Sequence, residues 1–541
     1  MSLHKFDSRR PAVMARNGMV ATSQSLAAMA GLRILMTGGN AADAAVAAAA
    51  ALNVTEPTST GLGGDCFALF YNAKTRTVTA LNGSGRAPAA LTLELVARHG
   101  MTRELPPYHA HTITVPGACA GWCDLIARHG TMPLHEVLGP AIQLAEEGFP
   151  VTPVIAYLWE RGAKRQLARS AGGRELTMDG RAPHAGEVMR LPTLARTLRA
   201  VAEGGKEAFY RGEIARKIAE TVQAHGGVMT VEDLAGHEST WDTPISATYR
   251  GVRIWECPPN GQGLAALIAL NVLEGFELEG QNPLGVERLH LLIEAMRVAF
   301  ADTQWYVADP AFRVIPLDAL LSKRYAQERR KLIDPTRATL DTQHGSPVGG
   351  SDTVYLTAVD GRGNACSFIN SLYMGFGTGI VPEGTGVSLQ NRGHLFSLDP
   401  AHPNALAPRK RPYHTIIPAL ATHEVDDSLY ASFGVMGGFM QPQGHVQVVV
   451  GLVDDGLDPQ AAVDRLRFCL TDARPTSRVE LEAGIPVETM AVLAEMGHEV
   501  VPVAGYGRTA FGRGQIIRRD PETGALWGGS DPRADGQAVG W

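Results

Sequence analysis

The sequence lacks an apolar run long enough to cross a membrane. A transmembrane helix needs about 18 uncharged apolar residues, and the Ala-rich stretch 41–52 is interrupted by Asp43. The first residues, MSLHKFDSRRPAVMARNG, are basic, but no apolar segment follows them. We therefore expect no membrane span, no secretory signal and a cytoplasmic location.

The chain also lacks a large excess of charge of either sign. Its formal net charge is -6 over 541 residues, and 19% of the residues are charged. Nucleic acids and anionic membranes are bound by clustered Lys and Arg, whereas the compact basic cluster here spans only 409–411. We expect neither nucleic acid nor membrane as a partner. The 45% of hydrophobic residues is ordinary for a globular protein with a sizeable core.

Several motifs that would indicate other chemistry are absent. No GxSxG elbow, HExxH pair or P-loop occurs, which disfavours a serine hydrolase, a metalloprotease and a nucleotide-dependent enzyme. The six cysteines form no CxxC and no zinc-ligand spacing, so we expect reduced, mostly buried thiols, no metal and no cofactor. The cysteines are Cys66, Cys119, Cys123, Cys257, Cys366 and Cys469.

The segments that are present alternate between helices and strand hairpins. Leu289, Ile293, Met296 and Phe300 recur at helical spacing, and Ala- and Leu-rich stretches also favour helices. There is no regular strand–helix–strand alternation, which indicates a layered α+β fold. The predicted helices are 25–36, 41–54, 287–305 and 445–453, and the predicted strands are 66–71, 77–81, 354–359, 365–370 and 429–438.

A threonine begins one of these hairpins. If the turn DGRGN pairs Val359 with Ala365, Thr353 lies opposite Ser371. Directly opposed residues have Cβ atoms about 4.5–5.5 Å apart, so the two hydroxyls would lie within hydrogen-bonding reach. Such a pair can simply stabilise a sheet, but it can also prepare a nucleophile.

The residues before Thr353 favour the nucleophile. A threonine hydroxyl needs a neighbouring base, and the α-amine of an N-terminal threonine is one such base because its pKa is about 7.7–8.0. This chemistry requires cleavage between Asp352 and Thr353, for which the flexible Gly349-Gly350 leader is suited. The alternative is that these glycines form an ordinary surface loop.

An amide hydrolase also needs donors for the oxyanion that develops during attack. Backbone N–H groups at a Gly-Gly turn can supply them. The best candidate is GVMGG (434–438), at the end of a predicted strand, and the second is GFGTG (375–379). Turns alone explain most such glycine pairs.

Eleven segments together resemble the γ-glutamyltransferase family of N-terminal nucleophile hydrolases. They occur in family order along nearly the whole chain: GGNAADAAVA, TGLGGDCF, VPGACAGW, EDLAGH, CPPNGQG, EAMRVAFAD, SDTVYLTAVDGRGNA, GFGTGIVPEGTG, RPYHTIIPA, MGGFMQPQG and SDPRADG.

The resemblance implies a four-layer αββα sandwich, an α+β fold made as one self-cleaving chain. Residues 1–352 would form the large subunit and 353–541 the small one, of 541 − 352 = 189 residues. Thr353 would be the nucleophile and Ser371 its hydroxyl partner. Gly437 and Gly438 would form the oxyanion hole. The family relation also allows a homodimer of processed pairs.

The residues that hold a glutamyl group in the family are changed here. The position of the arginine that binds the α-carboxylate falls on Ser84, and that of the aspartate that binds the α-amino group falls on Leu395. Two serines become His414 and Thr415, and an asparagine becomes Tyr373. Without an acidic partner, the α-ammonium of a glutamyl substrate would be buried and unpaired. The free-energy cost of such a group excludes the substrate instead of merely weakening its binding.

GSGRAP, QNRG and RPYHTIIP resemble the acylase-like branch of the family, which includes cephalosporin acylases and oxamate amidohydrolase. We therefore predict hydrolysis or transfer of a small carboxylate-bearing acyl group from a linear amide. Arginine offers a bidentate fork for a carboxylate, although surface ion pairs are an alternative role. A true γ-glutamyltransferase with an altered clamp and a non-catalytic family member remain alternatives. The predicted substrate-binding residues are Arg86, Tyr373, Asn391, Arg392, His414 and Thr415.

Overall fold

Two antiparallel sheets form the centre of the computed structural model, which describes residues 10–341 and 352–541. The predicted Gly-Gly leader and the side chain of Asp352 lie outside the described residues. The first sheet has the order β19 (Gln537–Gly540), β2 (Gly18–Thr22), β10 (Asp352–Asp360), β11 (Ala365–Tyr373), β3 (Asp65–Asn72), β4 (Thr77–Gly83) and β7 (Thr240–Asp242). The second sheet has the order β1 (Val13–Ala15), β18 (Leu526–Ser530), β17 (Arg513–Arg519), β13 (Leu429–Met436), β12 (Ala419–His423), β9 (Val252–Glu256) and β8 (Ile245–Tyr249).

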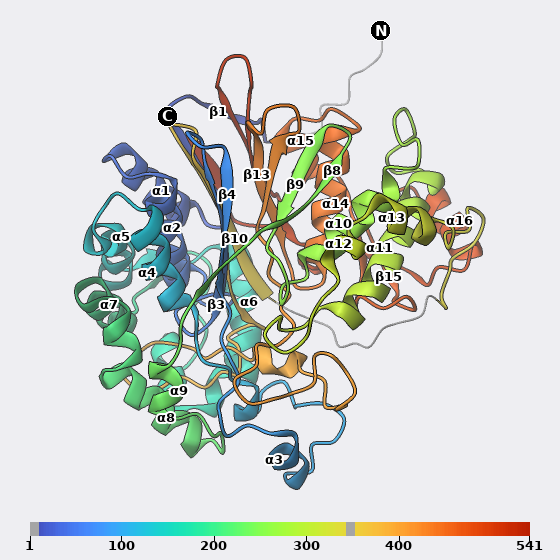
Figure 1. Ribbon diagram of the computed structural model, residues 1–541. Helices are drawn as coiled ribbons and strands as arrows, with labels where there is room; N and C mark the ends of the chain where they lie inside the picture. The colour runs from blue at the N-terminus through green and yellow to red at the C-terminus, as the bar shows by residue number, and fades with distance from the viewer. Residues whose placement is uncertain (1–9, 342–351) are drawn as a thin grey trace.

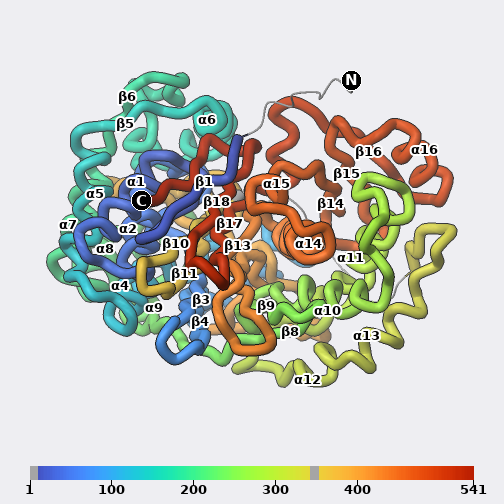
Figure 2. The backbone as a smooth tube through the Cα atoms, turned by 90° about the horizontal axis from the view of Figure 1, so that it is seen from above, coloured from blue at the N-terminus to red at the C-terminus, as the bar shows by residue number. Residues whose placement is uncertain are grey.

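Helices cover the outer faces of both sheets (Figure 1). On the first sheet lie α1 (Ser25–Met36), α2 (Ala41–Thr55) and α4 (Ala118–His129), with α5 (Leu134–Glu147) and α7 (Pro192–Tyr210) behind them. On the second sheet lie α10 (Gly263–Leu273), α14 (Met440–Val453) and α15 (Pro459–Asp464), with α11 (Val286–Tyr306) packed on α10. Figure 2 shows the four layers from above. The predicted αββα sandwich is confirmed.

The remaining elements lie around this sandwich. The helices are α3 (Leu93–Arg98), α6 (Pro153–Arg165), α8 (Glu213–Ala224), α9 (Val231–Ala235), α12 (Leu317–Leu320), α13 (Lys323–Arg330) and α16 (Val487–Glu495). Two small sheets contain β14 (Phe468–Leu470), β15 (Val479–Glu482) and β16 (Val500–Val503), and β5 (Phe149–Pro150) and β6 (Val188–Met189).

Helix α2 supports the strands that carry the candidate nucleophile. It begins with a capping box, in which the Asn40 side chain accepts from the backbone N–H of Asp43 and the Asp43 carboxylate accepts from that of Asn40. All of its residues are buried, and most are alanines. Small side chains let the helix approach β10 and β11 closely, which gives these strands a close-packed support.

The elements expected from the sequence are present, and most differ from their expected bounds by one to three residues. The helix expected at 445–453 is α14, which begins five residues earlier at Met440, and the strand expected at 429–438 is β13, which ends at Met436. The helix expected at 25–36 is α1, and the helix expected at 287–305 extends by one residue at each end as α11. The hairpin strands also extend slightly beyond their expected bounds. These agreements follow from local signals, namely helical spacing and hairpin turns.

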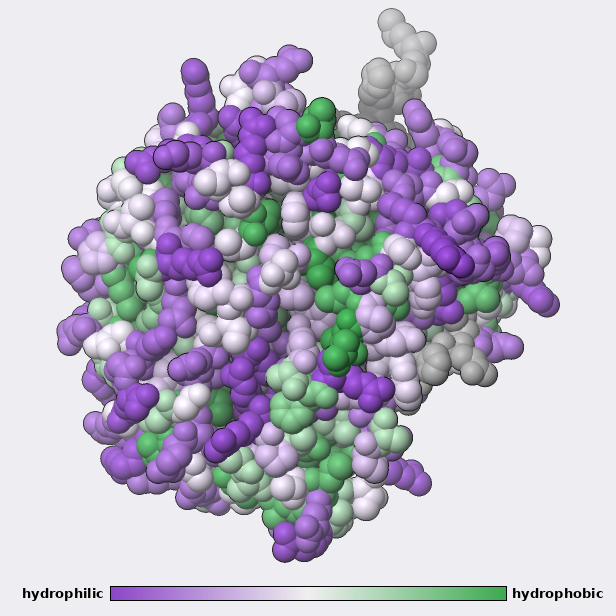
Figure 3. All heavy atoms as spheres, in the orientation of Figure 1, coloured by the Kyte–Doolittle hydropathy of each residue, from purple (hydrophilic) through white to green (hydrophobic). Residues whose placement is uncertain are grey.

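Polar side chains cover most of the face seen in Figure 3, and apolar residues gather near its middle. Among the described residues no helix has the length and apolar character needed to cross a bilayer. All six cysteines are free thiols, five of them buried and Cys123 half-buried.

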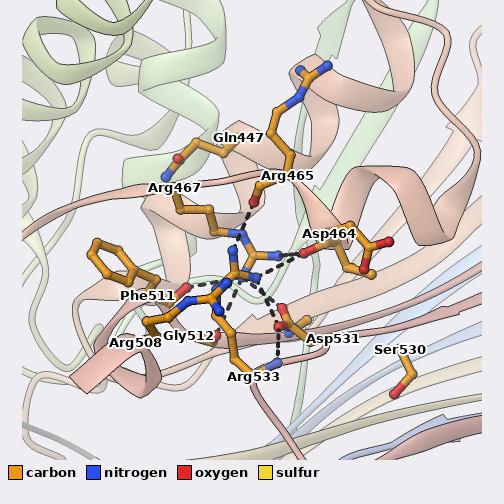
Figure 4. Close-up of polar contacts among 12 residues, drawn as sticks. Gln447, Asp464, Arg465, Arg467, Arg508, Phe511, Gly512, Ser530, Asp531 and Arg533 are labelled. Carbon is orange, nitrogen blue, oxygen red and sulfur yellow. Dashed lines mark hydrogen bonds and ion pairs between the residues drawn. The ribbon is translucent and has the colours of Figure 1, made fainter. Parts of the chain in front are cut away.

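A buried ion-pair network holds the beginning of β17 (Figure 4). Asp531 Oδ1 accepts from Arg533 at 2.9 Å. Its Oδ2 accepts from Arg467 at 2.9 Å and from the backbone N–H of Gly514 at 2.8 Å. Arg467 donates to the carbonyl of Phe511 at 3.0 Å. Burial raises the pKa of Asp531, but the two guanidinium groups outweigh this effect and hold the pKa below its usual value.

We expect Asp531→Asn to lower the free energy of unfolding by about 3–5 kcal/mol, because removing one partner leaves buried cations uncompensated. Since the folded pKa is depressed, the contribution of Asp531 is present above pH ~4 and is lost as the pH falls through the folded pKa. Chemical denaturation at pH 7 and below pH 4 measures both effects. Glu187→Gln, which breaks the exposed pair with Arg181, is the control and should lower the free energy of unfolding far less than Asp531→Asn. Similar losses in the two variants would contradict the expectation.

Candidate active site

Thr353 and Ser371 lie side by side at one end of the β10–β11 hairpin. The strands pair in the expected register from Val354–Asn370 to Val359–Ala365, and an irregularity before Val354 pairs Asp352 with Tyr373. Thr353 Oγ1 lies 3.1 Å from Ser371 Oγ, and both side chains are fully buried. The predicted proximity of the two hydroxyls is confirmed.

Arg392 binds the far side of Ser371. Its Nη2 donates to Ser371 Oγ at 3.0 Å, and its Nη1 donates to Thr415 Oγ1 at 2.5 Å. The guanidinium is fully buried, and burial lowers its pKa to about 10, so it stays protonated near neutral pH. Both arms of the fork are therefore committed to hydroxyl groups of the protein.

Asp65 provides the negative charge of this cluster. Its Oδ2 lies 3.8 Å from Arg392 Nε and 3.0 Å from His414 Nε2, while Oδ1 accepts from the Gly85 N–H at 2.8 Å. His414 Nδ1 accepts from the backbone N–H of Ile416 at 3.3 Å. Burial, reinforced by Arg392, lowers the pKa of His414 to about 3. His414 is therefore a neutral imidazole that donates from Nε2. We call Thr353, Ser371, Arg392, Thr415, Asp65 and His414 the Thr353 cluster.

Tyr373 lies against this cluster in a strained backbone conformation. Its φ is 77°, which is uncommon for a residue with a large side chain. Its N–H donates to Ser371 Oγ at 2.8 Å, and the Arg392 guanidinium carbon lies 4.6 Å from its ring centroid. The Tyr373 hydroxyl is buried without a hydrogen-bond partner among the described residues. A polar atom in that state is available to a ligand.

Gly437 and Gly438 connect β13 to α14, with φ values of 132° and 60° that glycine adopts readily. The Gln262 side chain ties them to the Thr353 cluster. Its Nε2 donates to the Gly438 carbonyl at 2.8 Å and to the Thr415 carbonyl at 2.6 Å. The predicted oxyanion glycines thus connect through Gln262, Thr415 and Arg392 to Ser371 and Thr353.

A second arginine holds the backbone of Thr353. Arg513 Nη2 donates to the Thr353 carbonyl at 3.5 Å, and its Nη1 binds Glu56 Oε1 at 3.0 Å. Glu56 also accepts from Ser23 Oγ at 2.6 Å. Burial raises the pKa of Glu56, although Arg513 opposes that shift. Thr353 is therefore fixed through its hydroxyl and its carbonyl, which restricts the direction of its side chain.

Two predicted substrate-binding residues have other positions or partners. The Asn391 side chain accepts from the Met374 N–H at 3.1 Å and donates to the Pro107 carbonyl at 2.7 Å, so it braces the backbone. Arg86 donates to the Glu238 carbonyl at 3.3 Å and lines a separate cavity with His237. The structure does not bring Arg86 into contact with the Thr353 cluster, whereas Arg392, His414, Thr415 and Tyr373 do meet there.

A cavity of about 750 Å³ lies next to Gly437. We call it the entrance cavity. Met374, Gly375 and Phe439 line it close to the candidate site, and α6 forms one of its walls. Its volume falls within the range of about 300–1,000 Å³ that is usual for small-molecule sites.

Sequence reasoning missed four residues that hold the site together: Asp65, Gln262, Arg513 and Glu56. Asp65 and Gln262 occur in the motifs TGLGGDCF and CPPNGQG, so the motifs marked their segments without revealing their partners. Arg513 and Glu56 are 457 residues apart and had no local signal.

Comparisons with known proteins agree with this geometry. The family model described as gamma-glutamyltranspeptidase matches residues 27–541. The glutathione hydrolase-like YwrD proenzyme of Bacillus subtilis is 37% identical over 532 residues, which cover 98% of this chain and 99% of that protein. The oxamate amidohydrolase proenzyme of Klebsiella pneumoniae is 34% identical over 538 residues, covering 97% and 98%. The crystal structure of cephalosporin acylase from Bacillus halodurans matches with a TM-score of 0.92 and 49% identity, covering 100% of this chain and 99% of that one.

The chain therefore belongs to the gamma-glutamyltranspeptidase family. It is an enzyme with the fold of the N-terminal nucleophile hydrolases, as the ordered motifs indicated. The curated relatives are described as proenzymes, in line with the predicted processing of a single precursor.

Proposed function

We propose that this protein is a self-processing amide hydrolase whose nucleophile is the hydroxyl of Thr353. The observation that carries the proposal is the contact of 3.1 Å between Thr353 Oγ1 and Ser371 Oγ at the start of a buried strand. Ser371 Oγ accepts from Arg392 and from the Tyr373 N–H, which use both lone pairs of the hydroxyl.

Self-cleavage comes first in this proposal. Thr353 Oγ1 attacks the carbonyl carbon of Asp352, and the acyl group moves from the Thr353 nitrogen to its oxygen. Water then hydrolyses the ester, which leaves a carboxylate on Asp352 and a free α-amine on Thr353. The new α-amine is the base for later turnovers, since its pKa is about 7.7–8.0.

In turnover, the α-amine takes the proton of Thr353 Oγ1 as this oxygen attacks the substrate amide. Negative charge develops on the carbonyl oxygen, and backbone N–H groups at Gly437 and Gly438 are the proposed donors to it. The α-ammonium gives its proton to the departing amine, and an acyl ester on Thr353 remains. Water, or an amine acceptor, then releases the acyl group. The buried hydroxyl of Ser371 lies beside the reacting oxygen. Arg392, which lies close to Asp65, polarises this hydroxyl.

The acyl group is proposed to be small and to carry a carboxylate. Ser84 is buried and accepts from Asn260 Nδ2 at 3.1 Å, and Leu395 packs against the core of the second sheet. Leu395 cannot bind an ammonium, and Ser84 carries no charge to pair with a carboxylate. Relatives named oxamate amidohydrolase and cephalosporin acylase support acyl groups other than glutamyl. Ordinary glutathione hydrolysis, supported by the name of other relatives, is the second candidate.

Mass spectrometry and a substrate panel test this proposal. We expect two chains, one beginning at Thr353, and faster hydrolysis of oxalyl or glutaryl anilides than of a γ-glutamyl anilide. The γ-glutamyl anilide differs from the glutaryl anilide by its α-amino group. The kcat/KM of the γ-glutamyl anilide divided by that of the glutaryl anilide therefore measures the effect of the missing acidic partner. We expect this ratio to be about 0.01 or lower, as for an unpaired buried charge. Equal or faster hydrolysis of the γ-glutamyl anilide would favour the second candidate.

A further inference from the structure

A second cavity, of about 290 Å³, lies between the segment 86–89 and the helix α9. We call it the His237 cavity. None of the described residues that line it belongs to the Thr353 cluster. Its volume is close to the lower end of the range of about 300–1,000 Å³ that is usual for small-molecule sites. The cavity therefore suits a ligand of a few heavy atoms.

His237 is buried in the wall of this cavity without a hydrogen-bond partner. The residue is 8% exposed, and neither of its ring nitrogens bonds to any described residue. Its ring stacks on Tyr210, with 5.4 Å between the ring centroids, so packing holds the imidazole in place. Burial, reinforced by Arg411 and Arg86, lowers the pKa of His237 to about 3. The neutral imidazole therefore has one N–H donor and one acceptor nitrogen that the described protein does not use.

Two guanidinium groups lie close to His237. Arg86 lines the cavity, and among the described residues its hydrogen bonds are limited to one, with the Glu238 carbonyl at 3.3 Å. Arg411 is 5% exposed, and its Nη1 donates to Thr240 Oγ1 at 3.0 Å, whereas its Nη2 has no described partner. Burial, reinforced by Arg86, lowers the pKa of Arg411 to about 10, so Arg411 stays protonated near neutral pH. Both groups are therefore cations with unused donors.

The acidic residues at the cavity do not neutralise these two cations. Asp233 caps α9, and its second oxygen accepts from the Ala89 N–H at 2.9 Å, so both oxygens are already occupied. Glu232 and Arg409 are exposed at the rim and carry opposite charges. The two guanidinium groups near His237 therefore decide the sign of charge that the cavity favours, which is negative in a ligand.

We propose that the His237 cavity binds the carboxylate of a small organic acid at a site separate from the Thr353 cluster. A guanidinium binds a carboxylate through two parallel hydrogen bonds, which gives Arg86 a partner. The N–H of His237 and the buried, unpartnered hydroxyl of Ser239 are further donors. Buried polar atoms without a partner are rare in native proteins, and one bound acceptor would satisfy several of them. The proposal goes beyond the amide hydrolysis proposed above and does not depend on it.

The segment that carries Arg86 separates the His237 cavity from the Thr353 cluster. The Gly85 N–H donates to Asp65 Oδ1 at 2.8 Å, and the next residue, Arg86, lines the cavity. A carboxylate in the cavity would therefore leave the hydroxyl of Thr353 uncovered. It should bind to the uncleaved and the cleaved protein alike.

Crystals soaked in 3-bromopropanoate locate the ligand, because the anomalous scattering of bromine marks its position. We expect bromine in the His237 cavity, with the carboxylate in contact with Arg86 and His237. Bromine at the Thr353 cluster or in the entrance cavity without any in the His237 cavity would overturn the proposal. So would crystals that contain no bound bromine.

A binding measurement in solution compares propanoate with propanamide, which has a similar shape but no charge. At constant ionic strength propanoate should raise the Tm with increasing concentration, and propanamide should not. Arg86→Met should raise the dissociation constant of propanoate about tenfold or more, as for the loss of a charge-assisted hydrogen bond. Arg216→Met removes an exposed arginine of α8 outside the cavity and should keep the wild-type constant. Equal constants for wild type and Arg86→Met would contradict the proposal.

Two further variants separate the remaining explanations. His237→Phe keeps a ring against Tyr210 but removes both nitrogens, so its dissociation constant for propanoate should rise as well. A wild-type constant in this variant would mean that the imidazole holds only a water molecule, which contradicts the proposal. Thr353→Ala should bind propanoate like the wild type, even if the proposed nucleophile is wrong. Loss of binding in Thr353→Ala would place the ligand at the Thr353 cluster and overturn the separate site.

Discussion

Thr353→Ala is expected to leave the protein as one chain of 541 residues, while the wild type yields chains of 352 and 541 − 352 = 189 residues. The variant loses the only atom of that side chain able to attack the Asp352 carbonyl, so cleavage and amide hydrolysis should both fall below detection. Alanine keeps the β carbon, and its small size suits the buried site. Denaturing electrophoresis and intact-mass spectrometry measure the outcome.

Thr353→Ser is the matched control because it retains the hydroxyl. We expect the serine variant to cleave and to turn over more slowly, since serine lacks the γ-methyl group that restricts the threonine rotamer. Its kcat/KM should rise with pH through the pKa of the α-amine, about 7.7–8.0 in an unperturbed chain. His414 should add no step between pH 5 and 9, because its pKa is about 3. Two chains from Thr353→Ala would refute the proposed nucleophile.

Arg392→Met is expected to lower kcat by about 100-fold, and to slow self-cleavage as well. The methionine fills similar space but removes the charge-assisted hydrogen bond to Ser371, worth about 1.5–3 kcal/mol. It also leaves the buried Asp65 carboxylate without its nearby cation. Single-turnover kinetics with a set of acyl anilides and the rate of self-cleavage measure the two effects.

The two roles considered for Arg392 predict different results. If Arg392 positions Ser371, kcat falls for acyl groups with and without a carboxylate, and Ser371→Ala combined with Arg392→Met is much less harmful than the sum of the single changes. If Arg392 binds the substrate carboxylate, as the sequence suggested, KM rises only for carboxylate-bearing acyl groups and self-cleavage is unaffected. Arg392→Lys keeps a charge without the fork and should fall between the wild type and the methionine variant.

The hairpin illustrates what could be predicted from local sequence. The turn after Asp360 sets the register, and the period of two places Thr353 opposite Ser371. A small irregularity at Asp352 did not separate the two hydroxyls. The Ala-rich helix α2 was also visible in the sequence, because helical propensity depends on the residues of the segment itself.

The surroundings of Ser371 could not be predicted in the same way. Arg392, Asp65 and His414 come from three segments that meet only when both sheets are stacked. From their motifs alone, Arg86 and Arg392 were equally good candidates to bind a substrate carboxylate. In the fold, Arg86 lines the cavity beside His237. Both terminal nitrogens of the Arg392 guanidinium donate to hydroxyl groups of the protein, those of Ser371 and Thr415.

By itself the sequence determined the family, the layered fold and the pairing of Thr353 with Ser371, because motif order, periodicity and hairpin register are properties of the chain. Only the tertiary structure decided which charges surround the nucleophile and where the arginines point. Those contacts join residues far apart in sequence, such as Asp65 and His414, which are 349 residues apart. Their partners depend on how buried groups can be neutralised in a common space, and no local pattern encodes that.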